Sequence, residues 1–486
     1  MIKIIYRTLV SIIILLLSII VFLSTFGIKT DKFNSKIISQ IKQIEPNVEL
    51  KLDVVGVTLD PLNFGINLKT IGTDLIYKKK IIGIESINSK ISIKFFLNNK
   101  FSLTEISIST KSLVLKDLIN FFRLFNNDPK LFVAEKFIEK GYVVVDLKLE
   151  FDDLGNIKDN FKFNELIKDA KIDLFRKYDL NKIDFVFDIN QNVSKFTEIR
   201  IILNDNNILI PELVALKKNS EYFVSGKLIT DNTSISKNEI NDFISKNLFE
   251  LDIQEILLSS KNDFKFKINK NLRINNFETK SEIDLHNLKF KNSLQLKKIF
   301  PKIKKDLILK NQKIKLEYNK NNLSIVGSGN ALLQSKIDEI NYEIYKKKDE
   351  VQFKTKLKIL KNPFKIDLIN FEKDINSDLE LNFVGKNNNK DKLLFNKISL
   401  KEKNNIISIK NLILSDDNKI NDLSNIDIEY TDNYGLKNNL KLKKKNNDFL
   451  VSGNSFNIKS IIDKLLDSEN DKNLKIFNKN FKIIFD

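Results

Sequence analysis

Residues Thr8 to Ile28 are mostly apolar and include no charged side chain. A helix needs about 20 apolar residues to cross a bilayer, so this run predicts a transmembrane anchor over residues 8–28. The run exceeds the roughly 7 to 15 residues of a signal-peptide core, and residues 24–27 form a poor small-residue cleavage pattern, which favours an uncleaved anchor over a cleaved signal peptide. The side chains that we expect in the bilayer include Leu9, Ile12, Ile13, Leu16, Ile19, Ile20 and Leu23.

The charges that flank this run predict its orientation. Lys3 and Arg7 precede it, whereas the lysines after it are accompanied by Asp31. The positive-inside rule therefore favours a short cytoplasmic segment over residues 1–7 and an extracytoplasmic location for the rest of the chain. Between residues 29 and 46, apolar residues recur at helical spacing and Pro46 would end a helix, so we expect a membrane-proximal helix there.

From Val48 onward the period of the pattern changes to two. Val48, Leu50 and Leu52 alternate with charged residues, as in a strand with one apolar and one solvated face. Similar runs recur almost to Asp486, and helical spacing interrupts them only near residues 115–122, 240–248 and 458–466. These helices are too few for a β-α-β fold. We therefore expect a mainly β fold in which a long curled antiparallel sheet with a few short helices fills residues 47–486; a sandwich and a barrel are the alternatives.

Each predicted strand has an apolar face that must be covered. A dry β core and a lipid-filled groove both meet this requirement. Moving an acyl chain of about sixteen carbons into water costs on the order of 10 kcal/mol, at about 0.8 kcal/mol per methylene, so a lipid in transit between membranes needs such a shelter. The candidate lining residues of a groove are Ile91, Ile93, Phe95, Ile106, Ile108, Leu147, Leu149, Phe185, Phe187, Leu316, Leu381 and Phe383.

The positive charge of the chain comes almost wholly from lysine. Lys+Arg 81 against Asp+Glu 63 gives a formal net charge of +18. Specific phosphate or base recognition favours the planar fork of arginine, whereas lysines here alternate with apolar residues, as in 264–268. We expect no nucleic-acid partner and, instead, a diffuse attraction to anionic membrane surfaces.

Catalytic chemistry is difficult to assemble from these residues. The chain has no cysteine, which excludes disulfides, thiolate metal ligands and cysteine nucleophiles. His286 is the only histidine, so neither a zinc site nor a serine triad is indicated. Gly327, Ser328 and Gly329 lack the further residues of a nucleotide-binding loop and predict a bulge or turn. We expect no enzyme activity, no cofactor and no metal.

The layout of the chain resembles the AsmA-like family of bacterial envelope proteins, which includes TamB and YhdP. The segment from Val48 to Phe122 carries the resemblance best, with a strand, a turn at Asp60 and Pro61, further alternating runs and a helix from Lys116. A second similarity lies at residues 451–457, where a glycine-containing strand end leads into the helix that starts at Ile458.

The resemblance implies a taco-shaped groove of strands that shelters phospholipid acyl chains between two membranes, as in bridge-like lipid transfer proteins. It implies a single-pass protein of the bacterial inner membrane with a cytoplasmic N-terminus and a periplasmic bulk. The expected partners are phospholipid or another membrane lipid, the inner membrane, and an outer-membrane or periplasmic protein. Because the chain ends in strand-like residues 481–485, we expect either a missing C-terminal portion or a partner.

A second functional reading stays open. A scaffold or assembly factor for outer-membrane proteins would recruit partners by adding strands to the sheet edges. An extracytoplasmic enzyme is a third reading, which lacks a catalytic constellation.

Overall fold

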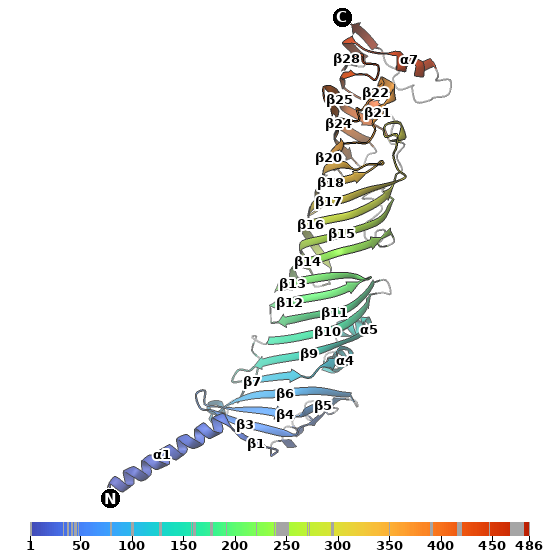
Figure 1. Ribbon diagram of the computed structural model, residues 1–486. Helices are drawn as coiled ribbons and strands as arrows, with labels where there is room; N and C mark the ends of the chain where they lie inside the picture. Colours follow the sequence, from blue (N-terminus) through green and yellow to red (C-terminus); the bar gives the residue numbers. More distant parts are fainter. Residues whose placement is uncertain are drawn as a thin grey trace. The chain divides into compact units, whose positions relative to one another are not determined.

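The computed structural model is mainly β, with one apolar helix at the N-terminus (Figure 1). The chain divides into two compact units, which are residues 1–227 with 267–273, and residues 228–266 with 274–486. The structure describes residues 2–32, 34–35, 38–39, 42, 46, 48–77, 80–98, 102–125, 129–156, 158, 162–174, 178–190, 192–219, 221–237, 239, 252–269, 271, 273–292, 296–348, 350–388, 392–415, 420–446, 448–466 and 481–485.

The predicted anchor is a helix, but it begins and ends earlier than the apolar run. Helix α1 spans Ile2–Thr25, and its segment Lys3–Thr25 is long and apolar enough to cross a membrane. Ile28, predicted to lie in the anchor, instead starts strand β1 (Ile28–Thr30). Gly27 separates the two elements with a left-handed φ of 64°, and a Cβ there would lie 2.4 Å from the Val57 carbonyl oxygen. Glycine is therefore required at this turn because it has neither the conformational restriction nor the Cβ.

The predicted membrane-proximal helix over residues 29–46 is wrong at its start. Strand β1 ends at Thr30 and pairs with β3 (Val54–Asp60), so Lys29 and Thr30 are extended. Residues 34, 35, 38, 39 and 42 are helical, and the remaining residues between 33 and 45 lie outside the described ones.

Unit 1 contains a sheet whose strands pair in the order β1–β3–β4–β6–β7–β9–β10–β11–β12–β13, all antiparallel (Figure 1). Its further elements are β2 (Val48–Lys51), β4 (Gly65–Ile71), β5 (Thr73–Tyr77), β6 (Lys80–Ser92), α3 (Ile93–Leu97), β7 (Leu103–Thr110), β8 (Leu113–Val114), α4 (Leu115–Phe125), α5 (Pro129–Phe137), β9 (Ile138–Glu150), β10 (Lys162–Leu174), β11 (Tyr178–Ile189), β12 (Val193–Leu203) and β13 (Asn206–Lys218). Strand β14 (Glu221–Ser236) contains the boundary between the units.

Unit 2 is likewise built from long neighbouring strands. They pair in the order β16–β17–β18–β19–β20–β23–β24–β25–β27–β28–β29–β30. Its elements are β15 (Ile253–Ile268), β16 (Ile274–Lys291), η1 (Leu296–Lys298), β17 (Asp306–Asn319), β18 (Asn322–Leu332), β19 (Asp338–Lys347), β20 (Glu350–Ile359), β21 (Lys365–Ile366), η2 (Asp367–Ile369), β22 (Phe371–Glu372), β23 (Leu379–Asn388), β24 (Lys392–Glu402), β25 (Asn405–Leu414), β26 (Ile420–Asp422), β27 (Asn425–Thr431), β28 (Lys437–Lys445), β29 (Asp448–Ser455), α7 (Lys459–Leu466) and β30 (Phe481–Phe485). The sheet was predicted to be antiparallel, but β29 and β30 pair in parallel.

Two of the predicted helices are confirmed, since α4 and α7 occupy the segments with helical spacing. Asn457 caps α7, because the backbone N–H of Lys459 donates to its side-chain oxygen at 3.2 Å. The helix predicted over 240–248 lies outside the described residues.

Two predicted strand positions are wrong for a local reason. Ile93 and Phe95 continue an alternating pattern from Ile91, yet they lie in α3. The hydroxyl of Ser92 accepts a hydrogen bond from the backbone N–H of Phe95 at 3.3 Å, which is an N-cap interaction that starts a helix. Strand β6 therefore ends at Ser92, and the chain continues as a helix although the alternating pattern predicts a strand.

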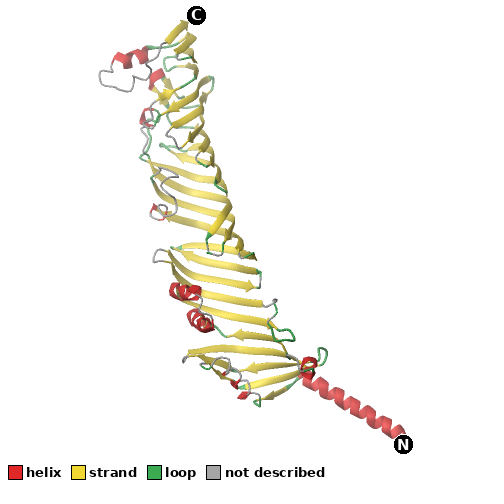
Figure 2. Ribbon diagram, turned by 180° about the vertical axis from the view of Figure 1, so that it is seen from behind, coloured by secondary structure: helices red, strands yellow, loops and turns green. Residues whose placement is uncertain are grey.

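Each unit has its own hydrophobic core. In unit 1, α4 and α5 pack on one end of strands β9 and β10, where Val143 and Ile167 are buried (Figures 1 and 2). In unit 2, the segment that contains η2 and β22 supplies Ile369 and Phe371, which pack with Leu379 at the end of the strands. In both units, elements outside the long strands therefore cover one end of an apolar sheet face.

Buried polar groups hold the covering segment of unit 2 in place. The Lys373 ammonium donates to the carbonyl oxygens of Leu360 at 2.7 Å and of Asp374 at 3.0 Å. The Glu402 carboxylate accepts hydrogen bonds from the Ser377 hydroxyl and from the backbone N–H of Asp374. These bonds satisfy charged groups that would otherwise be costly to bury.

We predict that Phe371→Ala strongly destabilises unit 2. Phe371 is 1% exposed, and removing a buried phenylalanine ring costs about 3 to 5 kcal/mol because it leaves a cavity. Phe277→Ala is the matched control, since Phe277 is 43% exposed. Hydrogen exchange in urea of the full chain should show lowered protection of β20, β23 and β24 only for Phe371→Ala; equal effects of the two substitutions would contradict the assigned core.

Candidate functional site

An apolar surface runs across consecutive strands of unit 1. Cross-strand pairing puts Ile87 opposite Ile108, Ile108 opposite Leu147, and Leu147 opposite Phe163. The next row pairs Leu68 with Ser89, Ser89 with Ile106, and Ile106 with Leu149. Directly opposed residues in a sheet lie on the same face, so these rows form one continuous surface, here called the apolar face of unit 1.

This face is covered only in part. Val143 and Ile167 lie beneath the packed helices and are buried, whereas Ile106, Leu147 and Leu149 are half-buried. A half-buried row of large aliphatic side chains in the described strands leaves apolar area available to a further apolar group.

The opposite face of the same strands is charged. Ser107 lies between Ile106 and Ile108 in β7 and faces the other way, where it opposes Lys148. The Glu105 carboxylate lies 3.1 Å from the Lys90 ammonium and 3.0 Å from that of Lys148. Burial opposes ionisation of Glu105, but the hydrogen bonds from the two lysines outweigh it and hold its pKa below the usual range.

One carboxyl group lies on the apolar face. Glu165 in β10 opposes Val145 in β9 and Phe187 in β11, and it is 7% exposed. It makes no hydrogen bond or ion pair with any residue that the structure describes. Burial in this apolar surrounding raises the pKa of Glu165 to about 8, because no neighbouring group stabilises the charged form.

Unit 2 has an apolar face of the same construction. Pairing places Ile314, Gly327, Tyr342, Thr355 and Phe383 in one row across β17 to β23. The neighbouring rows contain Leu316 on one side and Leu381 on the other. Leu381 is buried and Phe383 packs against the same core, whereas Leu316 is half-buried.

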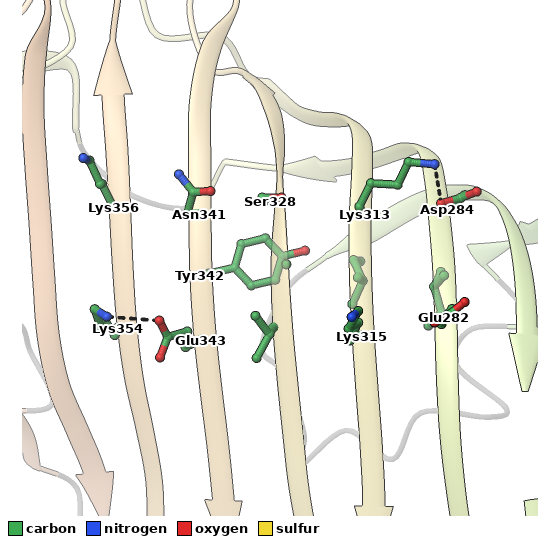
Figure 3. A pocket seen from close by; sticks show the side chains of 14 residues that line it. Glu282, Asp284, Lys313, Lys315, Ser328, Asn341, Tyr342, Glu343, Lys354 and Lys356 are labelled. Carbon is green, nitrogen blue, oxygen red and sulfur yellow. Dashed lines mark hydrogen bonds and ion pairs between the residues drawn. The ribbon is translucent and has the colours of Figure 1, made fainter. Parts of the chain in front are cut away.

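Tyr342 makes close contact with a glycine in this row. A Cβ on Gly327 would lie 2.3 Å from the Tyr342 ring carbon that carries the hydroxyl, so the ring occupies the space over strand β18 (Figure 3). The glycine in the strand interior permits this close approach. Burial raises the pKa of the Tyr342 hydroxyl to about 12, which keeps it neutral at physiological pH.

A hollow of about 820 Å³ lies over strands β16 to β20, four of which also carry this row. Its wall is formed mainly by the alternate positions that face away from Phe383, which are Glu282, Asp284, Lys313, Lys315, Val326, Ser328, Asn341, Glu343, Lys354 and Lys356. Figure 3 shows the ion pairs within it, Lys313 with Asp284 at 2.7 Å and Lys354 with Glu343 at 3.0 Å. The hollow is therefore a charged depression whose lysines are largely neutralised, and none of the predicted lining residues lies in it.

The predicted lining residues fall into separate places. Ile91 lies next to the last residue of β6, Ile106 and Ile108 lie in β7, and Leu147 and Leu149 lie in β9 of the apolar face of unit 1. Phe185 and Phe187 lie in β11 of the same unit, within its core cluster. Leu316, Leu381 and Phe383 lie in unit 2. Ile93 and Phe95 lie in α3 instead of a strand.

The sequence reading missed Glu165, although the pattern contains a sign of it. Residues 163–167 alternate Phe, Asn, Glu, Leu, Ile, which places Glu165 at the same parity as Phe163 and Ile167. The sequence alone does not decide which face such a charged residue occupies, because a shift of the strand by one residue would move it from the apolar face to solvent.

His286 belongs to a polar cluster in unit 2. Its Nε2 lies 3.0 Å from the Ser259 hydroxyl oxygen, and that hydroxyl donates to Asp231 at 2.9 Å. In a serine triad the imidazole lies between hydroxyl and carboxylate, whereas here the hydroxyl lies between the other two. A hydroxyl that donates to a carboxylate gives no proton to the histidine, so the cluster is not arranged for acyl transfer. No group of three metal-ligating side chains occurs among the described residues.

No protein-family model, curated protein or solved structure matches this chain. The similarity to AsmA-like proteins therefore stays an expectation from the layout of the chain.

We predict that the stability of unit 1 depends on pH through Glu165. Its folded-state pKa of about 8 lies above the ordinary value of 4.5, so the folded state holds a proton that the unfolded state releases. The contribution of Glu165 to the free energy of unfolding is then fully present below about pH 4.5 and is lost as the pH rises to about 8. The loss is at most about 1.4 kcal/mol per unit of difference between the two pKa values.

The measurement is urea-dependent hydrogen exchange of peptides that cover β10, between pH 5 and pH 9, for the full chain and for Glu165→Gln. The difference in the free energy of opening between the two proteins isolates Glu165, because the remaining groups titrate in both. A difference that does not change with pH would show that Glu165 is ionised or partnered in the folded protein.

Proposed function

We propose that this chain is a membrane-anchored protein that shelters the acyl chains of lipids on an apolar sheet face. Helix α1 holds it in the bacterial inner membrane, with the N-terminus in the cytoplasm and the two β units in the periplasm. The face passes phospholipid or another membrane lipid between the membranes of the envelope. Such passage requires the sheet to form a groove around the lipid, and the protein acts by binding, without enzyme chemistry.

The observation that carries this proposal is the half-buried apolar face of unit 1. Ile106, Leu147 and Leu149 keep apolar area exposed beside the buried positions under α4 and α5. Covering a methylene group removes about 0.8 kcal/mol of unfavourable contact with water. An acyl chain gains this free energy along each row that it covers. Among the residues named on this face, only Ser89 and Glu165 have polar side chains.

Helix α1 supports the membrane location. Leu9, Ile12, Ile13, Leu16 and Ile19 are all exposed on it, and the helix contacts the strands through its C-terminal end at β3. A long helix whose sides are mostly apolar and exposed is stabilised by surrounding lipid.

A second candidate function is a scaffold for outer-membrane proteins, and strand β30 supports it. β30 pairs with β29 on one side, and no other described strand pairs with it. Ile483 and Ile484 are exposed on this strand. An unpaired edge with apolar side chains is a template for a strand of another protein.

We predict that Ile108→Asp blocks lipid loading without unfolding the protein. Ile108 is half-buried on the apolar face, so a carboxylate there would have to be desolvated by an acyl chain. The reporter is a benzophenone amino acid at Leu149, on the same face. After ultraviolet irradiation in native membranes, mass spectrometry of the full chain should show a lipid adduct that falls about tenfold with Ile108→Asp.

The matched control is Ser107→Asp, the adjacent residue on the charged face, which should leave the adduct unchanged. A benzophenone at Lys148 should trap no lipid, because that side chain faces the other way. Equal trapping at positions 148 and 149, or no lipid adduct at either, would overturn the lipid proposal. A protein adduct at β30 in place of lipid would favour the scaffold.

A further inference from the structure

We propose that Glu165 is the recognition point for the ammonium group of an amine-bearing amphiphile. Glu165 releases its proton to water as the ammonium binds, the resulting carboxylate pairs with the ammonium, and the alkyl chain of the ligand lies along the apolar face of unit 1. This inference rests on the proposed function, since it requires that the face accepts alkyl chains.

Glu165 lies in the middle of an apolar neighbourhood. Phe163 and Ile167 flank it two residues away on the same strand, and Val145 and Phe187 oppose it on the two adjacent strands. Val145 and Phe187 are buried, as is Glu165 itself. No described residue of unit 1 makes a hydrogen bond or ion pair that would require a carboxylate here.

The other buried charged residues of the described chain all have partners. Asp338 accepts from the backbone N–H of Leu360 and from Asn362, at 3.1 and 2.8 Å. Glu402 and Lys373 are bonded as described above, and Asp432 accepts from the backbone N–H groups of Tyr434 and Leu436. Glu165 alone in this set has none, which is unusual for a buried ionisable group and points to a partner from outside the chain.

The side chains around Glu165 suit a cation. Phe163 and Phe187 have ring centroids 5.9 Å apart, and Phe187 and Phe196 have theirs 5.7 Å apart. Aromatic faces attract ammonium groups, most strongly where water is excluded. A carboxylate among aromatic rings therefore offers an ammonium both an ion pair and cation–π contacts, whereas it would repel a phosphate or a fatty-acid carboxylate.

The same face provides a place for the rest of the ligand. Leu147 opposes Phe163, and Ile108 opposes Leu147, so a half-buried aliphatic row leads away from the carboxylate along the adjacent strands. The ammonium end and the alkyl end of one molecule can thus be satisfied together.

The test uses the absence of cysteine from the chain. Leu147→Cys, labelled with a polarity-sensitive fluorophore, places one reporter beside Glu165. The full chain in phosphatidylcholine nanodiscs is titrated at pH 7.4 with dodecylamine, dodecanol and dodecanoate. We expect dodecylamine to saturate the reporter at a concentration about tenfold lower than dodecanol, and dodecanoate to bind most weakly.

Glu165→Gln should bring the dodecylamine and dodecanol midpoints to within about twofold of each other. Glu165→Leu, which suits the apolar neighbours, should do the same and guards against a fold defect of the glutamine variant. Glu212→Gln is the matched control, because Glu212 is exposed and pairs with Lys195, and it should keep the tenfold preference.

The outcomes separate this inference from the proposed function. A response to dodecanol with no amine preference, or a preference that persists in both Glu165 variants, would overturn the ammonium site while leaving an alkyl-binding face. No response to any of the three probes would overturn both.

Discussion

The alternation of side chains along each strand is the constraint on which the rest of this protein depends. In β7, Ile106 and Ile108 lie on one face and Ser107 on the other, and the register with β9 opposes aliphatic residues to Leu147 and Leu149 and the serine to Lys148. A slip of one residue would put lysines on the apolar face and leucines among the ion pairs. Each strand therefore fixes the register of its neighbour, and the apolar and charged faces persist across many strands.

A sheet with one apolar face must have something to cover it, and the two units meet this need in different ways. In unit 1 the cover is a pair of helices, α4 and α5, over Val143 and Ile167. In unit 2 it is a segment of short elements with Phe371, held by hydrogen bonds of Lys373 and Glu402. In unit 1 the cover ends while the apolar face continues, and the uncovered rows are the physical basis of the proposed lipid shelter.

Polar groups within the apolar regions distinguish structure from candidate function. Asp338, Lys373 and Glu402 are buried and fully engaged with their neighbours, so they stabilise the covering segment. Glu165 is also buried but has no partner among the described residues, so its burial lowers the stability of the folded protein. The charged hollow over β16 to β20 is the opposite case, since its main charges neutralise one another in ion pairs.

The sequence by itself determined the features that depend on local pattern. The uncharged run yields helix α1, the period of two yields long strands, and the helical spacing yields α4 and α7, because each of these follows from residues close together in the chain. Local chemistry also explains two errors, the Ser92 cap that turns Ile93 into a helix start and the glycine that ends the anchor before Ile28. Only the tertiary structure decided which apolar positions are covered, that Leu381 lies in a core while Ile108 stays half-buried, and that Glu165 has no partner among the described residues. These outcomes depend on segments far apart in sequence, such as α4 on β9, and alternation alone carries no information about which of them meet.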